Sequence, residues 1–450
     1  MPSFDEARRI ILASVAPVRV ERVALLEAAG RVLAEEIVAP WNMPFCDNSA
    51  MDGFAVRAAD CQHPAARLKI TGYLPAGGVP ERALEPGCAI KIMTGAPVPP
   101  GCDAVVPVEE TEESGAPSEP GVPSAPAVGG LGWEPSFGLL GRGGEVLIRP
   151  AVRPRQQIRF AGEDVAAGER ILAPGDVLHP PAISVLASFG RAEVAVYGRP
   201  RVAILSTGDE LIELGEPMAL GKVVNSNAYS LAAQVRECGA DPVVLGIARD
   251  DPEQMRGKLI EGLRADALIT SAGVSAGDRD YVRDVLAELE VRLLFREVKV
   301  KPGGPTAFGL KDSKPIFALP GNPVATMLIF EEMVRPALLK MMGHRRVLKA
   351  PVSAILQEPL KKRPGKVQLL RVRLERADCG YLAYSAGDQN TGILKTMLRA
   401  DGVAILPAEA TSFSPGDELS VHLLSGEPGM MEENTLTGEP FSGPSSQKQK

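Results

Sequence analysis

Ala267-Leu-Ile-Thr-Ser-Ala-Gly-Val-Ser-Ala-Gly-Asp-Arg-Asp280 is the first of three stretches in which an apolar run breaks into a glycine-rich turn with polar groups. The other two are Val298-Lys-Val-Lys-Pro-Gly-Gly-Pro305 and Ile316-Phe-Ala-Leu-Pro-Gly-Asn-Pro323. Glycine permits positive φ angles and lets a ligand approach backbone N–H groups closely. Turns of this kind at strand ends in an α/β sheet bind phosphates and other anions. The three stretches therefore predict a site for an anionic small molecule.

The sequence around these turns alternates strand-like and helix-like segments from about residue 200. Arg201–Leu205 and Pro242–Ile247 are predicted strands, and Ala228–Cys238 is a predicted helix. Asp251 followed by Pro252 is typical of a helix start, with an N-cap and then proline at the first helical position. This alternation predicts an α/β domain with a parallel, doubly wound sheet.

The residue patterns outside this region predict other kinds of structure. Ser3-Phe-Asp-Glu6 is a capping box that predicts a short N-terminal helix. Residues 41–110, 145–198 and 348–424 contain many short strand-like runs, which favours β-rich domains. Residues 112–142 and 425–450 are rich in Gly, Pro and Ser, so we expect a disordered insertion and a disordered tail.

Composition excludes several classes of protein. The net charge of -7 and the 4% aromatic content argue against a nucleic-acid binder. The six cysteines form no CxxC pair, which argues against a zinc site and is typical of a reducing cytosol. Asp5 and Glu6 precede the first apolar residues, and no apolar run reaches ~18 residues. We therefore expect a cytoplasmic protein without a signal peptide or membrane span.

Acidic residues follow three of the predicted strands, in Thr207-Gly-Asp-Glu210, Arg249-Asp-Asp251 and Gly277-Asp-Arg-Asp280. The carboxyl ends of parallel strands share one edge of a sheet, so these acids are expected to face one crevice. Carboxylates repel phosphate, but they bind Mg²⁺, which can lie between them and an anion. The alternative is that these acids only cap helices, and for Asp251 alone we favour that interpretation.

Other motifs are weaker when taken singly. Lys301 is positioned to neutralise a phosphate or oxyanion, although a lysine at a strand end is usually only solvated. Pro320-Gly-Asn-Pro323 predicts a rigid turn before a helix over Val324–Leu339, and a purely structural turn is an equal alternative. The loops that carry Asp52 and Thr94 look ordinary. No Walker loop or dinucleotide fingerprint occurs, which argues against an NTPase or a Rossmann oxidoreductase.

Together these motifs resemble the molybdopterin molybdenumtransferase family (MoeA-type), which includes the C-terminal domain of gephyrin. The resemblance covers roughly residues 1 to 424 and preserves the order of the motifs. The matching segments are Asn48-Ser-Ala-Met-Asp-Gly-Phe54, Ile92-Met-Thr-Gly-Ala96, Ser206-Thr-Gly-Asp-Glu210, Ala272-Gly-Val-Ser-Ala-Gly277 with Asp280, Lys301-Pro-Gly303 and Leu319-Pro-Gly-Asn-Pro323.

The resemblance implies a multidomain α/β fold. It implies an N-terminal helix at 1–19 that packs on the α/β domain, and a discontinuous linking domain at 20–40 and 145–198. It also implies a β-rich domain at 41–144 with the insertion 112–142, a doubly wound molybdopterin-binding domain at 200–345, and a C-terminal β-barrel at 346–424, before the tail.

The resemblance also implies the site. Its catalytic residues are Asp52, Thr94, Glu210, Asp250, Asp280 and Lys301, and the Mg²⁺ ligands among them are Glu210, Asp250 and Asp280. Its substrate-binding residues are Gly273, Val274, Ser275, Gly277, Pro302, Gly303, Pro320, Gly321, Asn322, Pro323, Arg371 and Thr391. A homodimer is implied, in which Asp52 and Thr94 come from one subunit and the other catalytic residues from its partner. Contact with other proteins of molybdenum cofactor biosynthesis is a further implied partnership.

The implied reaction is the Mg²⁺-dependent insertion of molybdate into adenylylated molybdopterin, with release of AMP. Several residues depart from the family pattern: Glu297 and Gly304 replace frequent lysines, Ala272 replaces a glycine, and Thr391 replaces a serine. Fewer positive charges beside an anion site favour a second hypothesis, a molybdopterin-binding or scaffold protein without transferase activity. The acids are all present, so we favour the enzyme.

Overall fold

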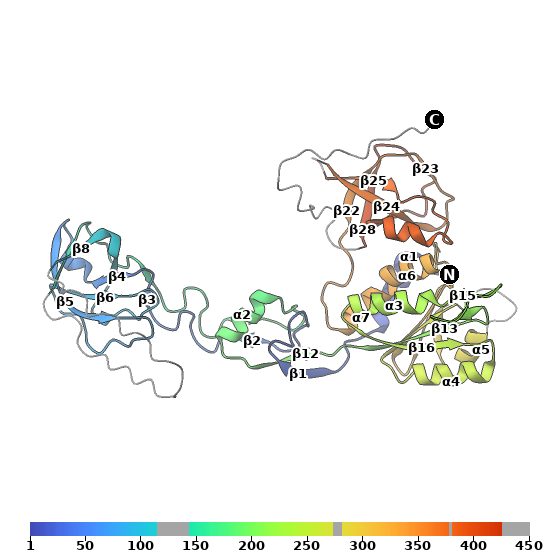
Figure 1. The fold of residues 1–450 in the computed structure, drawn as a ribbon, viewed down its shortest axis with the longest axis horizontal. Coiled ribbons are helices and arrows are strands. Elements are labelled where there is room, and N and C mark those ends of the chain that lie inside the picture. The colour runs from blue at the N-terminus through green and yellow to red at the C-terminus, as the bar shows by residue number, and fades with distance from the viewer. Residues whose placement is uncertain (115–143, 273–280, 378–379, 425–450) are drawn as a thin grey trace. The chain divides into compact units, whose positions relative to one another are not determined.

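The computed structural model describes residues 1–114, 144–272, 281–377 and 380–424. The chain divides into two compact units. The first comprises Met1–Glu35, Pro174–Ile183 and Ala192–Lys450, and the second comprises Glu36–Ala173 and Ser184–Arg191. Figure 1 shows the helices and strands and labels many of them. None of the described helices is long and apolar enough to cross a membrane.

The centre of the first unit is a six-stranded sheet with the order β16-β13-β17-β21-β20-β18. Its strands are β13 (Arg201–Thr207), β16 (Asp241–Ala248), β17 (Ala267–Ser271), β18 (Arg292–Phe295), β20 (Ala307–Lys311) and β21 (Lys314–Leu319). The first four strands in that order are parallel to one another. β20 is antiparallel to both of its neighbours, β21 and β18, so the sheet is mixed. The antiparallel part follows from the short connection Asp312–Ser313, which can join only antiparallel strands.

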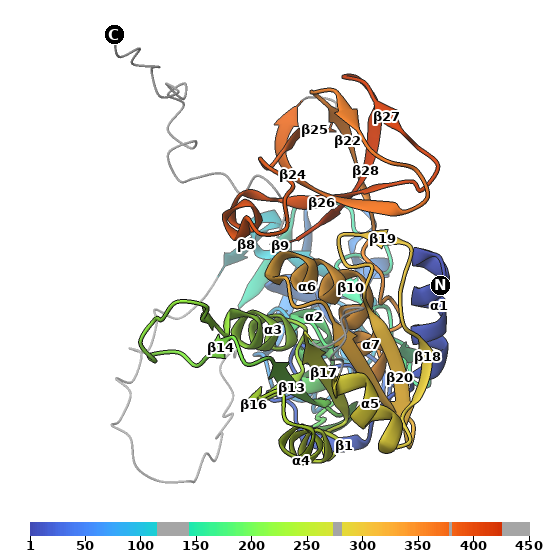
Figure 2. The same cartoon turned by 90° about the vertical axis from the view of Figure 1, so that its right-hand side faces the viewer.

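Helices cover both faces of this sheet (Figures 1 and 2). They are α1 (Phe4–Ser14), α3 (Ser226–Glu237), α4 (Pro252–Gly262), α5 (Tyr281–Glu288), α6 (Pro323–Ile329) and α7 (Arg335–Met341). The predicted capping box of α1 is present, because Ser3 and Glu6 exchange side-chain to backbone hydrogen bonds. The apolar side chains of α1 pack in the same core as α6, α7 and the sheet.

The predicted helix over Val324–Leu339 is interrupted by a π-helical turn, Phe330–Val334. Pro336 lacks the N–H group that would bond to the carbonyl four residues earlier, at Glu332, so the regular ladder cannot continue there. The turn buries both Glu331 and Glu332. Lys349 bonds to Glu331 at 2.8 Å, and the Nδ1 atom of His422 lies 2.9 Å from Glu332.

The C-terminal part of this unit is a closed five-stranded barrel, as predicted, which includes His422. Its strands are β22 (Val352–Leu356), β24 (Val367–Ala377), β25 (Gly380–Ser385), β26 (Gly402–Leu406) and β28 (Glu418–Leu423), and the pairing of β24 with β26 closes it. Figure 2 shows α6 between the barrel and the central sheet. Leu369 and Val403 of the barrel pack in one hydrophobic core with α6.

One strand is placed differently from the sequence expectation. The run Val298–Lys301 was expected to end a strand of the α/β sheet, but β19 (Val300–Lys301) pairs in parallel with β24 of the barrel. The glycine turn after Lys301 therefore lies where the α/β domain meets the barrel.

The second unit contains a six-stranded sheet with the order β7-β4-β6-β5-β9-β8. Its strands are β4 (Gly53–Val56), β5 (Ala66–Leu74), β6 (Cys88–Ile92), β7 (Ala104–Pro107), β8 (Thr111–Ser114) and β9 (Glu145–Ile148). Because β9 pairs with β5 and β8, this sheet extends past the expected domain boundary at residue 144. β8 likewise extends into the expected insertion 112–142, and residues 115–142 lie outside the described ones.

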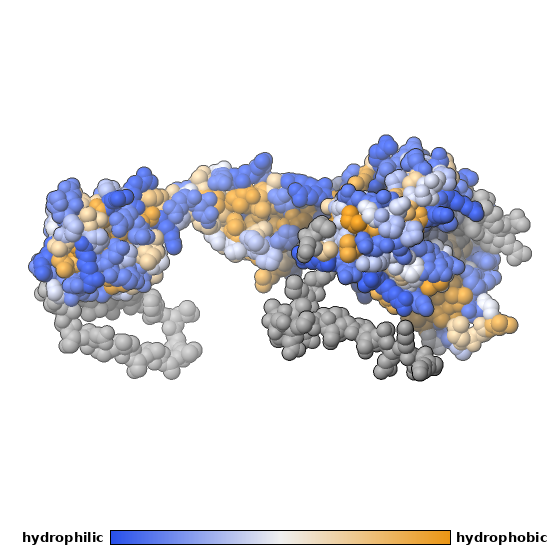
Figure 3. Space-filling model, turned by 90° about the horizontal axis from the view of Figure 1, so that it is seen from above, coloured by the Kyte–Doolittle hydropathy of each residue, from blue (hydrophilic) through white to orange (hydrophobic). Residues whose placement is uncertain are grey.

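Smaller elements complete the chain. The two-stranded pairs are β1 (Val20–Ala24) with β12 (Glu193–Tyr197), β2 (Ile37–Val38) with β11 (Arg170–Leu172), β3 (Asn48–Ser49) with β10 (Ile158–Arg159), β14 (Leu211–Ile212) with β15 (Val223–Val224), and β23 (Leu360–Lys361) with β27 (Ser412–Phe413). Short 3₁₀ helices are Ala58–Cys61, Val108–Glu110 and Leu394–Arg399. Helix α2 (Pro180–Ser188) is predominantly apolar yet buries only Leu186, and Figure 3 shows apolar residues gathered around it.

Candidate functional site

The turn after β13 places a carboxylate directly over a glycine. Gly208 has a φ of +136°, a conformation that side chains rarely adopt. A Cβ added there would lie 2.3 Å from the Oε2 atom of Glu210, so the carboxylate would have to move aside, and the positive φ itself favours glycine. The Gly208 N–H donates to the carbonyl of Ala248 on the neighbouring strand at 3.1 Å. The backbone thus holds Glu210 at the edge where β13 and β16 end.

The loop after β16 is tied to the same turn. The Asp250 N–H donates to Asp209 at 3.1 Å, and Arg249 donates to the carbonyl of Leu211 at 2.7 Å. Asp251 accepts hydrogen bonds from the N–H groups of Glu253 and Gln254 at 2.9 Å, which confirms its predicted role as a helix cap. Asp209 and Asp251 are therefore engaged in holding the backbone.

Glu210 and Asp250, in contrast, have exposed carboxylates that form no hydrogen bond or ion pair with the residues the structure describes. Two free carboxylates at adjacent strand ends fit the oxygen-rich coordination of Mg²⁺. The third predicted ligand, Asp280, lies outside the described residues, as do Gly273, Val274, Ser275 and Gly277. Among the described residues alone, no three acidic, His or Cys side chains form a metal cluster.

A set of buried polar side chains surrounds the ends of β13, β17 and β21, and sequence reasoning missed it. Asn227 donates to the hydroxyl of Ser271 at 2.7 Å and to the carbonyl of Gly321 at 2.8 Å, so it joins two of the glycine turns. Several atoms of the set are buried and have no partner within the described ranges: Ser206 Oγ, Asn225 Nδ2, Asn227 Oδ1, Thr270 Oγ1 and Asn322 Oδ1. Buried polar atoms need partners, so this set is suited to a polar ligand or to water. The available signal was Asn225-Ser-Asn227, with two asparagines at the start of a helix.

The turn after β21 is fitted closely to the turn after β17. Ala272 has a φ of +74°, in the left-handed region that favours glycine. Its Cβ lies 3.0 Å from the point where a Cβ on Gly321 would stand, so a side chain at Gly321 would crowd Ala272. Pro320 accepts a hydrogen bond from the Thr326 hydroxyl, which fixes the turn on α6. Of the predicted residues here, Asn322 occupies the N-cap position of α6 without a side-chain cap bond, and Pro323 begins the helix.

The turn after Lys301 also rests on α6. Gly303 has a φ of +100°, and a Cβ there would lie 2.3 Å from the Cγ1 atom of Ile329. Lys301 is exposed, while the flanking Val300 is buried. The structure thus places the turns at Pro302–Gly303 and Pro320–Pro323 on one helix, as the expectation of a shared site requires.

Arg371 of β24 lies on the barrel face that meets α6. It is only 1% exposed, and its Nη2 atom donates to the carbonyls of Asp388 at 3.0 Å and Asn390 at 3.4 Å. Its Nε atom is buried without a partner among the described residues. Burial lowers the pKa of this guanidinium, and the nearby Asp388 opposes that shift. Thr391, another predicted substrate-binding residue, directly follows Asn390, so the bonds of Arg371 bring it close to Thr391.

The second unit brings Asp52 and Thr94 together. The Oδ1 atom of Asp52 accepts hydrogen bonds from the backbone N–H and from the hydroxyl of Thr94, both at 2.7 Å. These two bonds lower the pKa of Asp52, the backbone bond most strongly. The second oxygen of this exposed carboxylate has no partner in the described part of the chain.

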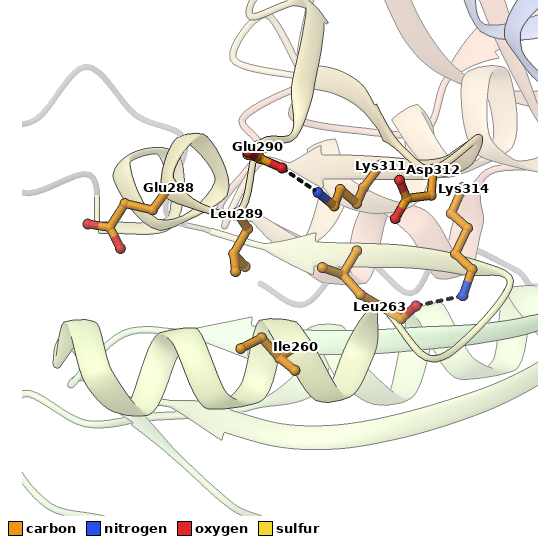
Figure 4. A pocket seen from close by; sticks show the side chains of 8 residues that line it. All are labelled: Ile260, Leu263, Glu288, Leu289, Glu290, Lys311, Asp312 and Lys314. Atoms are coloured by element: carbon orange, nitrogen blue, oxygen red, sulfur yellow. Dashed lines mark hydrogen bonds and ion pairs between the residues drawn. The ribbon is translucent and has the colours of Figure 1, made fainter.

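Two other features do not qualify as the site. A hollow of about 370 Å³ lies at the opposite end of β17 and β21, and Figure 4 shows its lysines already bonded. Lys311 pairs with Glu290 at 3.1 Å, and Lys314 donates to the carbonyl of Leu263 at 2.7 Å. Burial raises the pKa of the Cys238 thiol to about 12, so this thiol is not a nucleophile at neutral pH.

Family models and relatives match the chain along its length. Residues 2–190 match the MoeA N-terminal region (domain I and II), residues 203–340 a probable molybdopterin binding domain, and residues 353–424 the MoeA C-terminal region (domain IV). The chain belongs to the molybdopterin molybdenumtransferase (MoeA) family. This confirms the resemblance seen in the sequence.

Relatives agree with this assignment. Molybdopterin molybdenumtransferase 2 of Mycobacterium tuberculosis is 35% identical over 433 residues, which cover 94% of this chain and 99% of the relative. Molybdopterin molybdenumtransferase of Haemophilus influenzae is 32% identical over 432 residues, which cover 94% and 100%. The crystal structure of a molybdopterin biosynthesis MoeA protein from Pyrococcus horikoshii superposes with a TM-score of 0.75 at 28% identity, covering 94% and 100%. The MoeA-like fold is therefore confirmed.

Proposed function

We propose that this MoeA family member inserts molybdate into adenylylated molybdopterin and releases AMP during molybdenum cofactor biosynthesis. The single observation that carries the proposal is the edge where β13, β16, β17 and β21 end. There, two carboxylates stand near buried polar atoms, and none of these groups has a partner among the residues that the structure describes. An anionic pterin substrate supplies the hydrogen-bond partners that these atoms lack, and full-length relatives named molybdopterin molybdenumtransferase give its chemical class.

The residues have distinct roles in this proposal. Glu210 and Asp250, with Asp280, would hold Mg²⁺, which when bound neutralises phosphate charge beside the acids. The Asn227 amide keeps the turns after β17 and β21 in register, and α3 presents its N-terminus toward a phosphate. Lys301 and Arg371 supply positive charge for molybdate and for the phosphates of adenylylated molybdopterin. Two backbone carbonyls hold Arg371 in one orientation.

The dimer belongs to the proposal as well. Asp52 is oriented by Thr94, and its second carboxylate oxygen is unbonded within the described ranges, which suits a group that completes a partner's site. The apolar helix α2 buries only Leu186 and offers surface for an association between subunits. A mixture of inactive Asp52→Ala and inactive Asp280→Asn chains should regain some activity through hybrid dimers. A monomer in light scattering, or no recovery after confirmed subunit exchange, would contradict the shared site.

The test of the function is turnover of adenylylated molybdopterin with molybdate by the purified protein, with AMP release as the readout. Mg²⁺-dependent AMP release supports the enzyme. Tight binding of molybdopterin without AMP release would instead support the scaffold hypothesis.

A further inference from the structure

The pairing of β19 with β24 brings a lysine of the barrel to the glycine turn after Lys301. Val300 is in register with Val367, and the Val367 N–H donates to the carbonyl of Lys299 at 3.0 Å. The next residue back along the chain is Lys366. Its Nζ atom lies 3.6 Å from the point where a Cβ on Gly304 would stand, so the ammonium group lies over this glycine.

Within the part of the chain that the structure describes, Lys366 has no structural partner that explains its position. It is exposed, and its ammonium forms no ion pair or hydrogen bond with any residue in the described ranges. Lys362 on the same segment behaves in the opposite way, because its ammonium donates to the carbonyls of Pro407, Ala408 and Ala410. Lys362 therefore stabilises the barrel, while the charge of Lys366 is left for a ligand.

The turn beneath Lys366 adds donors of its own. Pro302 and Pro305 have no N–H groups, and the two glycines between them donate no backbone hydrogen bond to an acceptor in the described part of the chain. Two successive free N–H groups form a favourable setting for an anion. Lys301 and Lys366 both stand at this turn, and neither is bonded to a carboxylate of the described residues, so two positive charges are available to an anion here.

We propose that Lys366 is a substrate-binding residue, which reaches from the barrel to hold the oxyanion or phosphate at the Gly303–Gly304 turn together with Lys301. This inference rests on the proposed function and adds to it a residue outside the α/β domain. It also explains how the chain tolerates Gly304, where the family pattern often has lysine. In this chain Lys366 of the barrel supplies the positive charge next to Gly304.

The experiment measures molybdate binding to the full-length protein by calorimetry at low and high salt. Lys366→Ala should weaken binding about tenfold at low salt and less at high salt, because a partly exposed charge is screened. Lys366→Arg should stay within about threefold of wild type, since the charge is kept. Lys361→Ala is the matched control: it removes an exposed lysine of the same domain and should leave binding unchanged.

Gly304→Lys in the Lys366→Ala background provides a rescue. Gly304 has no left-handed φ, and a Cβ there meets only ordinary contacts of 3.4 Å or more. The double variant should therefore fold and regain most of the lost affinity.

The outcomes separate the two proposals. If the wild-type protein binds neither molybdate nor AMP, the proposed function fails. If the wild-type protein binds molybdate but Lys366→Ala behaves like Lys361→Ala, the function stands and the role of Lys366 is overturned. If thermal melting shows that Lys366→Ala loses stability and the rescue variant does not regain affinity, Lys366 is structural and the proposal is again overturned.

Discussion

The π-helical turn and the strand ends of the central sheet both carry acids, and the molecule treats them in opposite ways. Glu331 and Glu332 are buried, and Lys349 and His422 lie within 3 Å of them. Glu210 and Asp250 are exposed and have no cation beside them within the described residues. A buried carboxylate without a partner is expensive, so the first pair needs permanent partners. The comparison teaches that pairing, rather than the presence of acids, distinguishes a structural charge from a functional one.

The largest effect is expected at the buried acid. Glu332→Ala should lower the free energy of unfolding by about 3–5 kcal/mol, because it leaves Arg8 and His422 without their common partner. The melting temperature of the first unit should fall by several degrees, measured by calorimetry. Glu409→Gln, which changes an exposed acid of the same unit, should stay within about 0.5 kcal/mol.

The contrast would break down if Glu332→Ala melted like Glu409→Gln. That result would mean that the contacts of Glu332 with Arg8 and His422 contribute nothing to the stability of the fold, although Glu332 is buried.

The next effect is expected at the exposed acid. Glu210→Gln removes one charge with little change of shape, so turnover should fall about 100-fold, which corresponds to about 2.7 kcal/mol. Stability should change by less than about 0.5 kcal/mol, since this carboxylate has no partner among the described residues. Glu253→Gln, on the neighbouring helix α4, is the control and should keep its turnover. Removal of Mg²⁺ with a chelator should abolish turnover and leave melting unchanged.

Near-normal turnover by folded Glu210→Gln would show that Glu210 is not a ligand of Mg²⁺. A large loss of stability would instead place Glu210 with Glu332 among the structural acids.

A smaller effect is expected at Ala272, where the chain carries strain beside the site. A left-handed conformation costs a side chain about 1–2 kcal/mol, and glycine avoids this cost but gains entropy in the unfolded state. Ala272→Gly should therefore raise stability by up to about 1 kcal/mol in urea unfolding. Ala219→Gly is the control at an ordinary φ, and it should not stabilise. A loss of stability on Ala272→Gly would show that the packing of its methyl group against Gly321 outweighs the strain.

Local signals in the sequence predicted much of the fold. The capping box at Ser3 and the N-cap at Asp251 were read correctly, because each depends on residues only a few positions apart. The parallel strands and the glycine turns were also predicted from short patterns. The closed barrel came from the family resemblance, since no local pattern specifies closure.

What the sequence could not predict depends on distant contacts. The run Val298–Lys301 has strand-like alternation, but only the folded chain shows that its partner is β24 and not the α/β sheet. The same pairing brings Lys366 to Gly304. The two residues are far apart in the sequence, so no local pattern predicts this contact. Asn227 was missed because an asparagine in a first helical turn is common, and its bonds to Ser271 and Gly321 arise from tertiary structure.

The smallest effect is expected in the second unit, at the acid that is exposed yet partly bonded. Thr94 lowers the pKa of Asp52 through its N–H and then its hydroxyl, so the ionised form is favoured in the folded protein. A lowered pKa stabilises the fold above the ordinary value near 3.9, and this stabilisation is lost as the pH falls through the lowered pKa. Thr94→Val removes only the hydroxyl bond, so the pKa of Asp52 should rise but remain below its ordinary value, because the stronger backbone bond is kept. A carbon-detected NMR titration of the Asp52 carboxyl group measures the shift. Thr111→Val is the control, because the Thr111 hydroxyl donates to the carbonyl of Val108 and not to the Asp52 carboxylate. If the titration of Asp52 does not move in Thr94→Val, the hydroxyl does not bond in solution, and Asp52 belongs with the freely solvated acids rather than with those the fold orients.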